Sequence, residues 1–223
     1  MTALPFTFHG AALQALPSGA LHWPAQNTLI VSDLHLGKTE RIARQGGPIL
    51  PPYEITETLD RLANDIATTE PKRVICLGDS FDDLTAARAT RETVMGRLAP
   101  IMAGRHWVWI EGNHDPGPVD IAGEHLAELT QGPLTFRHIA QVAQTTQPAE
   151  ISGHYHPKAR VMIRGRSITR RCFLVDDTRI ILPAYGTYTG GLFTDHPALT
   201  RLMHPNASAL LLGETPVALP MPR

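Results

Sequence analysis

Four short motifs in this sequence combine carboxylate, imidazole and amide side chains. In chain order they are Asp33-Leu34-His35, Gly78-Asp79-Ser80-Phe81-Asp82, Gly112-Asn113-His114-Asp115 and Gly153-His154-Tyr155-His156. Such ligands, without thiolates, suit Mn, Fe or Zn ions and differ from the cysteine-rich sets of structural zinc sites. The motifs therefore predict a site for divalent transition metals.

The spacing inside two motifs favours ligands that share one ion. Residues i and i+2 of an extended segment point the same way, so Asp33 and His35 can reach one ion, as can His154 and His156. A carboxylate such as Asp79 can bridge two ions about 3.5–4 Å apart, as in phosphatases and nucleases. A strand-end aspartate alone is more often a turn or cap residue. The four motifs together predict a dinuclear centre.

Short buried strands are expected directly before the first three motifs, over Thr28–Ser32, Arg73–Leu77 and Trp107–Ile110. Between them, apolar residues recur at helical spacing and predict helices over Tyr53–Ala67 and Leu84–Met102. This alternation predicts an α/β fold with parallel strands. Ligands of such sheets bind beyond the carboxyl ends of the strands, which is where the motifs stand.

The second half of the chain is predicted to be mostly β-structure. Strands are expected over Leu134–Ile139, Glu150–Ser152, Arg160–Arg164, Cys172–Val175 and Arg179–Leu182, with a terminal hairpin of Ala209–Leu212 and Val217–Leu219. Asp176-Asp177 is a plausible hairpin turn. Phe6–Trp23 is expected to add one or two edge strands, and Ile121–Leu129 to form a short helix.

Composition predicts one globular domain over residues 1–223, since the chain is 43% hydrophobic and 18% charged. A net charge of −1 lacks the global basic field of a non-specific nucleic-acid binder, so any such contact must be local. Cys76 and Cys172 lie in apolar runs and are expected to be reduced core thiols. With no membrane-length apolar run and no signal-peptide pattern at the start, we expect a cytoplasmic location and no membrane partner.

The ordered motifs resemble those of the calcineurin-like metallophosphoesterases, from Asp33 to at least His156. The resemblance implies a four-layer αββα sandwich of two mixed β-sheets. It assigns one metal to Asp33, His35, Asp79 and His156, and a second metal to Asp79, Asn113 and His154. It also implies that His114 faces the substrate and helps the leaving group. The family usually adds one more histidine to the second metal.

Two histidines lie where that further ligand is expected. His138 ends the strand-like run that starts at Leu134, and His125 lies in the predicted helix Ile121–Leu129. We favour His138 and keep His125 as the alternative. Asp82 or Asp83 is expected to orient a ligand from behind, and the sequence does not separate the two.

Longer segments resemble a bacterial subfamily, the ligase-associated DNA damage response endonucleases. They are Asp33–Lys38, Gly78–Phe81, Phe136–His138, Ile151–Lys158 and Leu182–Leu192. The resemblance implies a DNA-repair context and an association with an ATP-dependent DNA ligase and DNA-processing enzymes. It also leads us to expect His at position 82, where this chain has Asp82, so the role of that position stays open.

The expected activity is that of a metal-dependent phosphodiesterase or endonuclease acting on DNA. Two divalent ions, most consistent with Mn²⁺, would bridge a hydroxide that attacks phosphorus in line. A small-molecule phosphoesterase, acting on nucleotides or cyclic nucleotides, and an inactive binding scaffold are the alternatives.

Basic residues near the motifs are candidate contacts for DNA phosphates. Lys38 follows the first motif, and residues 158–171 hold six basic residues, including Arg164 and Arg166, and no acidic residue. The alternatives are a solvated face for Lys38 and, for residues 158–171, an exposed hairpin whose charges prevent edge pairing.

Overall fold

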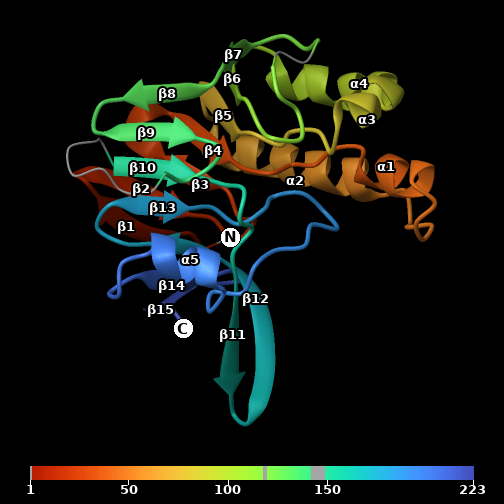
Figure 1. Ribbon diagram of the computed structural model, residues 1–223. Coiled ribbons are helices and arrows are strands. Elements are labelled where there is room, and N and C mark those ends of the chain that lie inside the picture. Colours follow the sequence, from red (N-terminus) through yellow and green to blue (C-terminus); the bar gives the residue numbers. More distant parts are fainter. Residues whose placement is uncertain (1, 118–119, 142–148) are drawn as a thin grey trace.

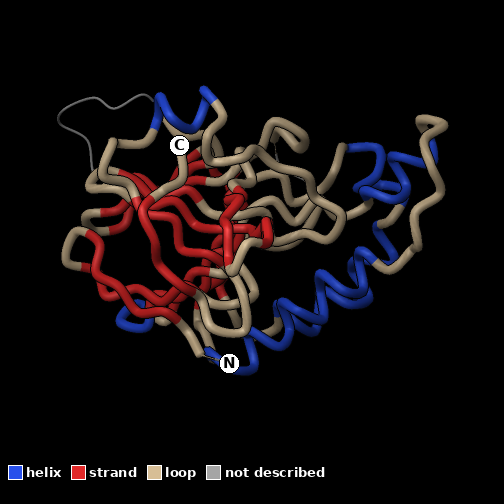
Figure 2. The backbone as a smooth tube through the Cα atoms, turned by 90° about the horizontal axis from the view of Figure 1, so that it is seen from below, coloured by secondary structure: helices blue, strands red, loops and turns tan. Residues whose placement is uncertain are grey.

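Two mixed β-sheets pack face to face, with helices on their outer sides (Figure 1). The computed structural model describes residues 2–117, 120–141 and 149–223. Figure 2 shows the strands gathered together, with helices on opposite sides of them. This α/β sandwich is the fold that the resemblance implied.

The first sheet has the strand order β1-β2-β3-β4-β5-β6-β7. Its strands are β1 (Leu4–Phe8), β2 (Ala11–Ala15), β3 (Leu21–Trp23), β4 (Thr28–Val31), β5 (Arg73–Leu77), β6 (His106–Ile110) and β7 (Glu124–Leu126). β1 to β4 are antiparallel neighbours, whereas β4 to β7 run parallel. The carboxyl ends of β4, β5 and β6 therefore share one edge of the sheet, and the first three motifs follow them there.

Helices cover the outer face of this sheet. They are α1 (Lys38–Arg44), α2 (Glu54–Thr69), α3 (Leu84–Ala89) and α4 (Arg91–Met102), with the 3₁₀ turn η1 at Pro24–Gln26. Leu59 and Leu62 of α2 and Leu98 of α4 are fully buried against Val74 and Trp107 of the sheet. Burying one such leucine contributes roughly 1.5–3 kcal/mol, so this layer holds the parallel strands in place.

The second sheet has the order β15-β14-β12-β13-β10-β9-β8, and β11 pairs with β12 outside this path. Its strands are β8 (Glu128–Gln131), β9 (Leu134–Arg137), β10 (Ala149–Ser152), β11 (Lys158–Ile163), β12 (Arg166–Val175), β13 (Arg179–Ile181), β14 (Ser208–Leu211) and β15 (Val217–Pro220). Phe136, Ile151 and Phe173 pack against Ile75 and Val108 of the first sheet. The short helix α5 (Pro197–Leu202) packs through Leu199 on the opposite face.

The predicted strands are all present, with ends shifted by one or two residues, except that β12 starts at Arg166, six residues before the predicted Cys172. Three expectations need correction. The N-terminal stretch forms three strands, β1 to β3, instead of one or two. The single helix predicted over Leu84–Met102 is divided at Thr90, whose hydroxyl donates to the Ala86 carbonyl at 2.8 Å and whose φ of −100° ends the first helix.

The helix predicted over Ile121–Leu129 is wrong, because the segment forms β7 and the start of β8. Gly123 has a φ of +124°, and a side chain there would overlap the Trp109 ring. β7 instead extends the first sheet by pairing parallel to β6, which sets His125 opposite Trp109. Pairing with β6 therefore stabilises this segment as a strand more than its helical spacing of apolar residues would stabilise a helix.

Across the ranges 2–117, 120–141 and 149–223, no helix combines the length and the apolar character needed to cross a bilayer. Cys76 and Cys172 are buried free thiols, as the apolar runs around them predict.

Candidate metal centre

The four motifs meet at one edge of the sandwich, each in a loop that follows a strand. Their backbone is strained there. Positive φ angles, between 46° and 69°, occur at Asp33, His35, Asp79, His154 and His156. Non-glycine residues rarely adopt this conformation, and where they do it often marks a functional site. The paired residues of the first and fourth motifs thus converge through left-handed turns, and not through the extended backbone expected from their spacing.

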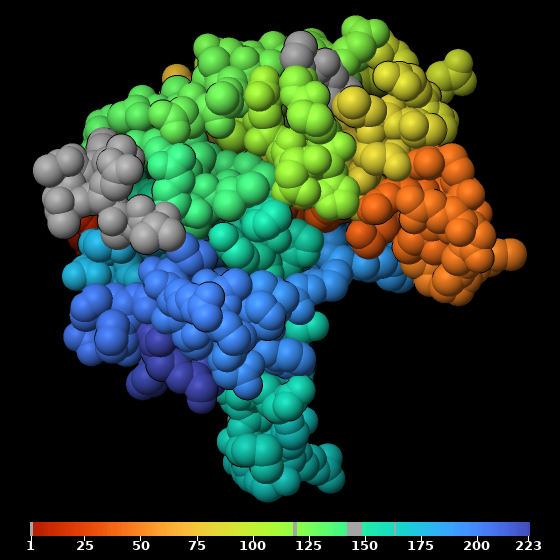
Figure 3. Space-filling view, viewed as in Figure 1, coloured from red at the N-terminus to blue at the C-terminus, as the bar shows by residue number. Residues whose placement is uncertain are grey.

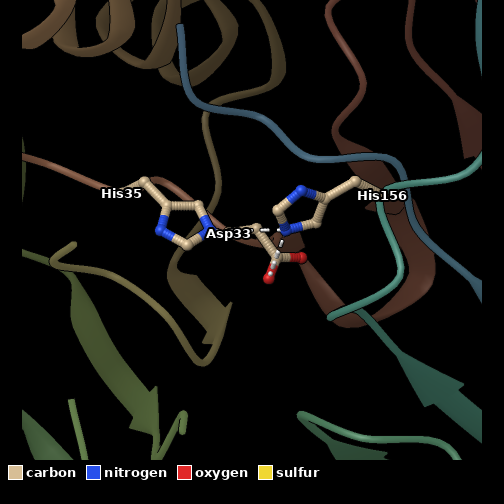
Figure 4. A group of neighbouring side chains, drawn as sticks. All are labelled: Asp33, His35 and His156. Carbon is tan, nitrogen blue, oxygen red and sulfur yellow. Dashed lines mark hydrogen bonds and ion pairs between the residues drawn. The ribbon is translucent and has the colours of Figure 1, made fainter. Parts of the chain in front are cut away.

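One cluster consists of Asp33, His35 and His156, whose ligating atoms all lie within 4.8 Å of one another (Figure 4). Nε2 of His156 is 3.1 Å from Oδ1 of Asp33 and 3.3 Å from Nε2 of His35. Asp33 is fully buried, and the Ser32 hydroxyl donates to its Oδ2 at 2.5 Å.

A second cluster consists of Asp79, His138 and His154. Nε2 of His138 is 3.3 Å from Oδ2 of Asp79, 3.3 Å from Nδ1 of His154 and 2.9 Å from Oδ1 of Asn113. The Nδ1 atom of His138 is 2.8 Å from the Leu77 carbonyl, to which it donates, so Nε2 is the ring nitrogen that faces the cluster. Gly78 makes this approach possible, because a Cβ there would overlap the His138 ring.

Asp79 lies between the two clusters. Its Oδ2 is 3.9 Å from Nε2 of His35 in the first cluster and 3.3 Å from Nε2 of His138 in the second. The backbone N–H of His114 donates to its other oxygen at 2.9 Å. One carboxylate is therefore within reach of both groups of histidines.

The electrostatics favour ionised carboxylates in the metal-free protein. Burial raises the pKa of Asp33, but the hydrogen bond and charge of His156, with the charge of His138 and the Ser32 hydroxyl, lower it to about 2. Burial lowers the pKa of His138, but the hydrogen bond to Asp79 and the charges of Asp33 and Asp79 raise it to about 9. Burial lowers the pKa of His154. A proton on His138 thus offsets part of the carboxylate charge when no cation is bound.

Asp82 and Asp83 have different surroundings. Asp82 is fully buried, with its carboxylate 2.8 Å from Nδ1 of His35 and within 3.1 Å of Lys38 and Arg41. Asp83 is partly exposed, where it caps α3 by accepting from the Ala86 N–H at 2.6 Å. Asp82 is therefore the aspartate that contacts a candidate ligand from behind, and Lys38 forms an ion pair with it.

His114 stands beside the two clusters and is partly exposed. Its Nδ1 atom is 2.7 Å from the Asp82 carbonyl oxygen, to which it donates, and its Nε2 is 4.0 Å from Oδ2 of Asp79. A group at this position can reach a molecule that binds over the clusters.

His125 lies outside both clusters. Its ring stacks on Trp109 at 6.5 Å, and its Nε2 contacts the Ile121 carbonyl at 3.1 Å. The predicted substrate-binding residues Arg164 and Arg166 lie away from both histidine clusters. They are at the tip of the β11–β12 hairpin.

Two further residues support the site and were not singled out from the sequence. Ser32 donates to Asp33, as described above. Asp115 is buried and accepts the backbone N–H groups of Ser80 and Phe81 at 2.8 and 3.0 Å, which holds the loop after Asp79. The sequence did contain a signal for Asp115, which belongs to the third motif. For Ser32 the only signal was its position directly before Asp33.

The donor set fits divalent transition metals. In each cluster, two imidazole nitrogens approach within 3.3 Å beside a buried carboxylate. Lone pairs and a negative charge at these distances repel one another. The arrangement is therefore favourable only when protons or a cation lie between the imidazole nitrogens and the carboxylate. Mixed imidazole, carboxylate and amide donors suit Mn, Fe or Zn.

Comparison with known proteins agrees with this chemistry. The family described as calcineurin-like phosphoesterase matches residues 27–200. Among solved structures, the crystal structure of Pseudomonas putida nuclease MPE is similar, with a TM-score of 0.75 and 28% sequence identity. That match covers 97% of this chain and 100% of the nuclease chain. A search of curated proteins found no match.

Proposed function

The chain belongs to the calcineurin-like phosphoesterase family, and from this premise we propose that it is a nuclease that hydrolyses DNA phosphodiester bonds with two divalent ions. The observation that carries the proposal is the position of Asp79 between the two clusters of histidines. The similarity to a nuclease supports a nucleic-acid substrate, and the motifs shared with the DNA damage response endonucleases favour DNA.

In this proposal each cluster holds one ion. Asp33, His35, Asp79 and His156 would hold the first, and Asp79, Asn113, His138 and His154 the second. When bound, such ions supply Lewis acidity that activates water and neutralises charge on phosphoryl oxygens. Mn²⁺ is the preferred ion, with Fe and Zn as alternatives.

The protein's own residues position these ligands and transfer protons. Asp82 orients His35 through Nδ1, and the Leu77 carbonyl orients His138 in the same way. His114 donates from Nδ1 to the Asp82 carbonyl, so in its protonated form Nε2 is free to donate to the leaving oxygen. Lys38, Arg164 and Arg166 are the proposed substrate-binding cations.

We place this activity in DNA repair in the cytoplasm, in association with an ATP-dependent DNA ligase and DNA-processing enzymes. The subfamily motifs support the DNA-repair context, and the buried free thiols Cys76 and Cys172 support a reducing compartment such as the cytoplasm. Hydrolysis of nucleotides or cyclic nucleotides is the alternative activity.

The test is Mn²⁺-dependent cleavage of single-stranded and nicked plasmid DNA by protein stripped of metal and reloaded. His114→Ala protein prepared identically excludes a contaminating nuclease. Cleavage by the wild type and not by the variant supports the proposal. If neither cuts DNA while the wild type hydrolyses bis(p-nitrophenyl) phosphate, the small-molecule alternative replaces it.

A further inference from the structure

A two-stranded arm, defined as residues 158–171, projects from the body of the protein (Figure 3). It starts two residues after His156, and β11 pairs with β12 from Lys158↔Arg171 to Ile163↔Arg166. The second half of β12 continues into the second sheet by pairing with β13 and β14. The arm is thus rooted rigidly in the sandwich, directly beside the candidate metal centre.

The cations of the arm form two groups. At the root, Lys158 and Arg160 stack over the Phe193 ring at 4.6 and 4.4 Å, and Arg171 donates to the Ala184 carbonyl at 2.8 Å. Arg164 and Arg166 are exposed at the tip, and Arg170, which pairs with Ala159 near the root, is exposed as well. None of the three forms an ion pair with an acidic residue of the described ranges. The contacts of Lys158, Arg160 and Arg171 therefore secure the arm, whereas Arg164, Arg166 and Arg170 face solvent.

The tip is a tight turn with an unfavourable residue. Arg164 and Gly165 both have positive φ, 49° and 76°, as the two central residues of a type I′ turn require. Asparagine or aspartate is the usual residue at the first of these positions, and arginine is strained there. Next to it, Met162 is 67% exposed. The tip therefore exposes the cation of Arg164 and the apolar side chain of Met162. The positive φ of Arg164 makes this turn less stable than one with asparagine or glycine at that position.

We propose that this arm binds the sugar-phosphate backbone of a nucleic-acid strand whose scissile phosphate lies at the metal centre, so that the substrate is a polynucleotide. The inference rests on the proposed function and deepens it. The three solvent-facing arginines, in a segment without an acidic residue, match a polyanion, whereas protection of the strand edges would be served equally by charges of mixed sign.

The length of the arm sets where the contact falls. Six residues of β11 at about 3.4 Å each place the tip about 20 Å from the root. One strand of a duplex rises about 3.4 Å per nucleotide along the helix axis, so a strand that follows the arm would meet its tip about six nucleotides from the scissile phosphate. A mononucleotide or cyclic nucleotide cannot contact both places. Contact between the arms of two copies of this chain is less favourable than contact with a polyanion, because like charges would then face each other.

The test compares three metal-loaded proteins: the wild type, R164A/R166A, and the control K72A/R201A. The control also removes two exposed cations, at the amino end of β5 and on α5. Cleavage is measured on DNA oligonucleotides of about 4 to about 24 nucleotides over a range of salt concentrations. Hydrolysis of bis(p-nitrophenyl) phosphate reports the metal centre alone, and sedimentation velocity reports the oligomeric state.

We expect kcat/KM of the wild type and of the control to rise with DNA length and then level off. In R164A/R166A, kcat/KM for long DNA should fall about tenfold, and its log–log salt slope should become shallower by about 1.4 to 1.8 for two lost contacts. Hydrolysis of bis(p-nitrophenyl) phosphate should be unchanged. In the control K72A/R201A, kcat/KM for long DNA, its salt slope and the hydrolysis of bis(p-nitrophenyl) phosphate should all equal those of the wild type.

Other results separate the two proposals. If length and salt dependence are the same in all three proteins, the arm does not bind the strand, while the proposed nuclease stands. A dimer that only R164A/R166A disrupts assigns the arm to a second copy instead. If the wild type hydrolyses bis(p-nitrophenyl) phosphate but neither cuts nor binds DNA, both proposals are overturned.

Discussion

The Nδ1 atom of His35 lies 2.8 Å from Oδ1 of Asp82, and both side chains are buried. Lys38 and Arg41 contact the same carboxylate from its outer side. Burial raises the pKa of Asp82, but the hydrogen bonds from His35 and Lys38 and the charges of these two groups lower it below its usual value, so Asp82 stays ionised. An ionised partner at Nδ1 directs the Nε2 lone pair of His35 into the first cluster.

Asp82→Asn should therefore weaken metal binding about 10- to 100-fold, because the imidazole loses its charged partner. The measurement is the Mn²⁺ concentration that half-activates bis(p-nitrophenyl) phosphate hydrolysis. Asp83→Asn is the matched control, since asparagine also caps helices well and Asp83 contacts no candidate ligand. An equal loss in both variants would show that Asp82 has no special role in orienting His35.

His114→Ala should lower kcat on DNA by about 10²- to 10⁴-fold, if His114 protonates the leaving oxygen. Its side chain stands beside the clusters and is absent from the two ligand sets, so the Mn²⁺ dependence should not change. The loss on bis(p-nitrophenyl) phosphate should be much smaller, since p-nitrophenolate leaves without a proton. Equal losses on both substrates would exclude a role in leaving-group protonation.

His138→Ala and His125→Ala distinguish the two candidates for the remaining ligand. The first variant should reduce the bound Mn²⁺ from about two to about one per chain, because a single ligand loss opens the second cluster. His125→Ala should keep both ions. Its free energy of unfolding should fall by about 0.5–1.5 kcal/mol, because the variant lacks the ring that stacks on Trp109. Elemental analysis of dialysed protein and thermal unfolding measure the two effects. Metal loss in His125→Ala alone would reverse the assignment.

The stability of the metal-free protein should fall as the pH rises through the range between 6.5 and about 9. The pKa of His138 is raised to about 9, which means that the folded state binds its proton more tightly than the unfolded state. This stabilisation is complete below 6.5 and is lost above about 9, an effect of about 3 kcal/mol. Urea unfolding after chelation, at several pH values, measures it. A His138→Asn variant should lack this alkaline decline, and the same decline in the variant would contradict the explanation.

The sequence alone predicted the three parallel strands β4, β5 and β6 and the motifs that follow them. β5 has the predicted bounds, Arg73–Leu77, and β4 and β6 differ by one residue at one end. The reason is local: short apolar runs that end in glycine and polar residues admit few structures besides a buried strand and a turn. Because parallel strands bring their carboxyl ends to one edge, the order of the motifs also predicted that they would meet.

Pairing and local strain were decided by the tertiary structure. A segment with helical spacing, Ile121–Leu129, became β7 and β8 because the edge of a sheet was available beside Trp109. The left-handed backbone at Asp33 and His35 is held by hydrogen bonds to the loop that follows β5, where their N–H groups donate to the carbonyls of Gly78 and Asp79, and no local pattern records these bonds. The same contacts place the side chains differently from the extended segment that the spacing indicated.

The tertiary structure was also needed to assign different roles to residues of the same chemical type. Asp82 and Asp83 are adjacent carboxylates, and His125 and His138 are both plausible ligands by position in the chain. Only the packed structure brings Asp82 to His35 and His138 to Asp79, while Asp83 caps a helix and His125 stacks on a tryptophan. The residue types determined by themselves which chemistry this protein can perform. Which of those residues converge was decided by long-range packing, because atoms distant in the chain meet only when both sheets are assembled.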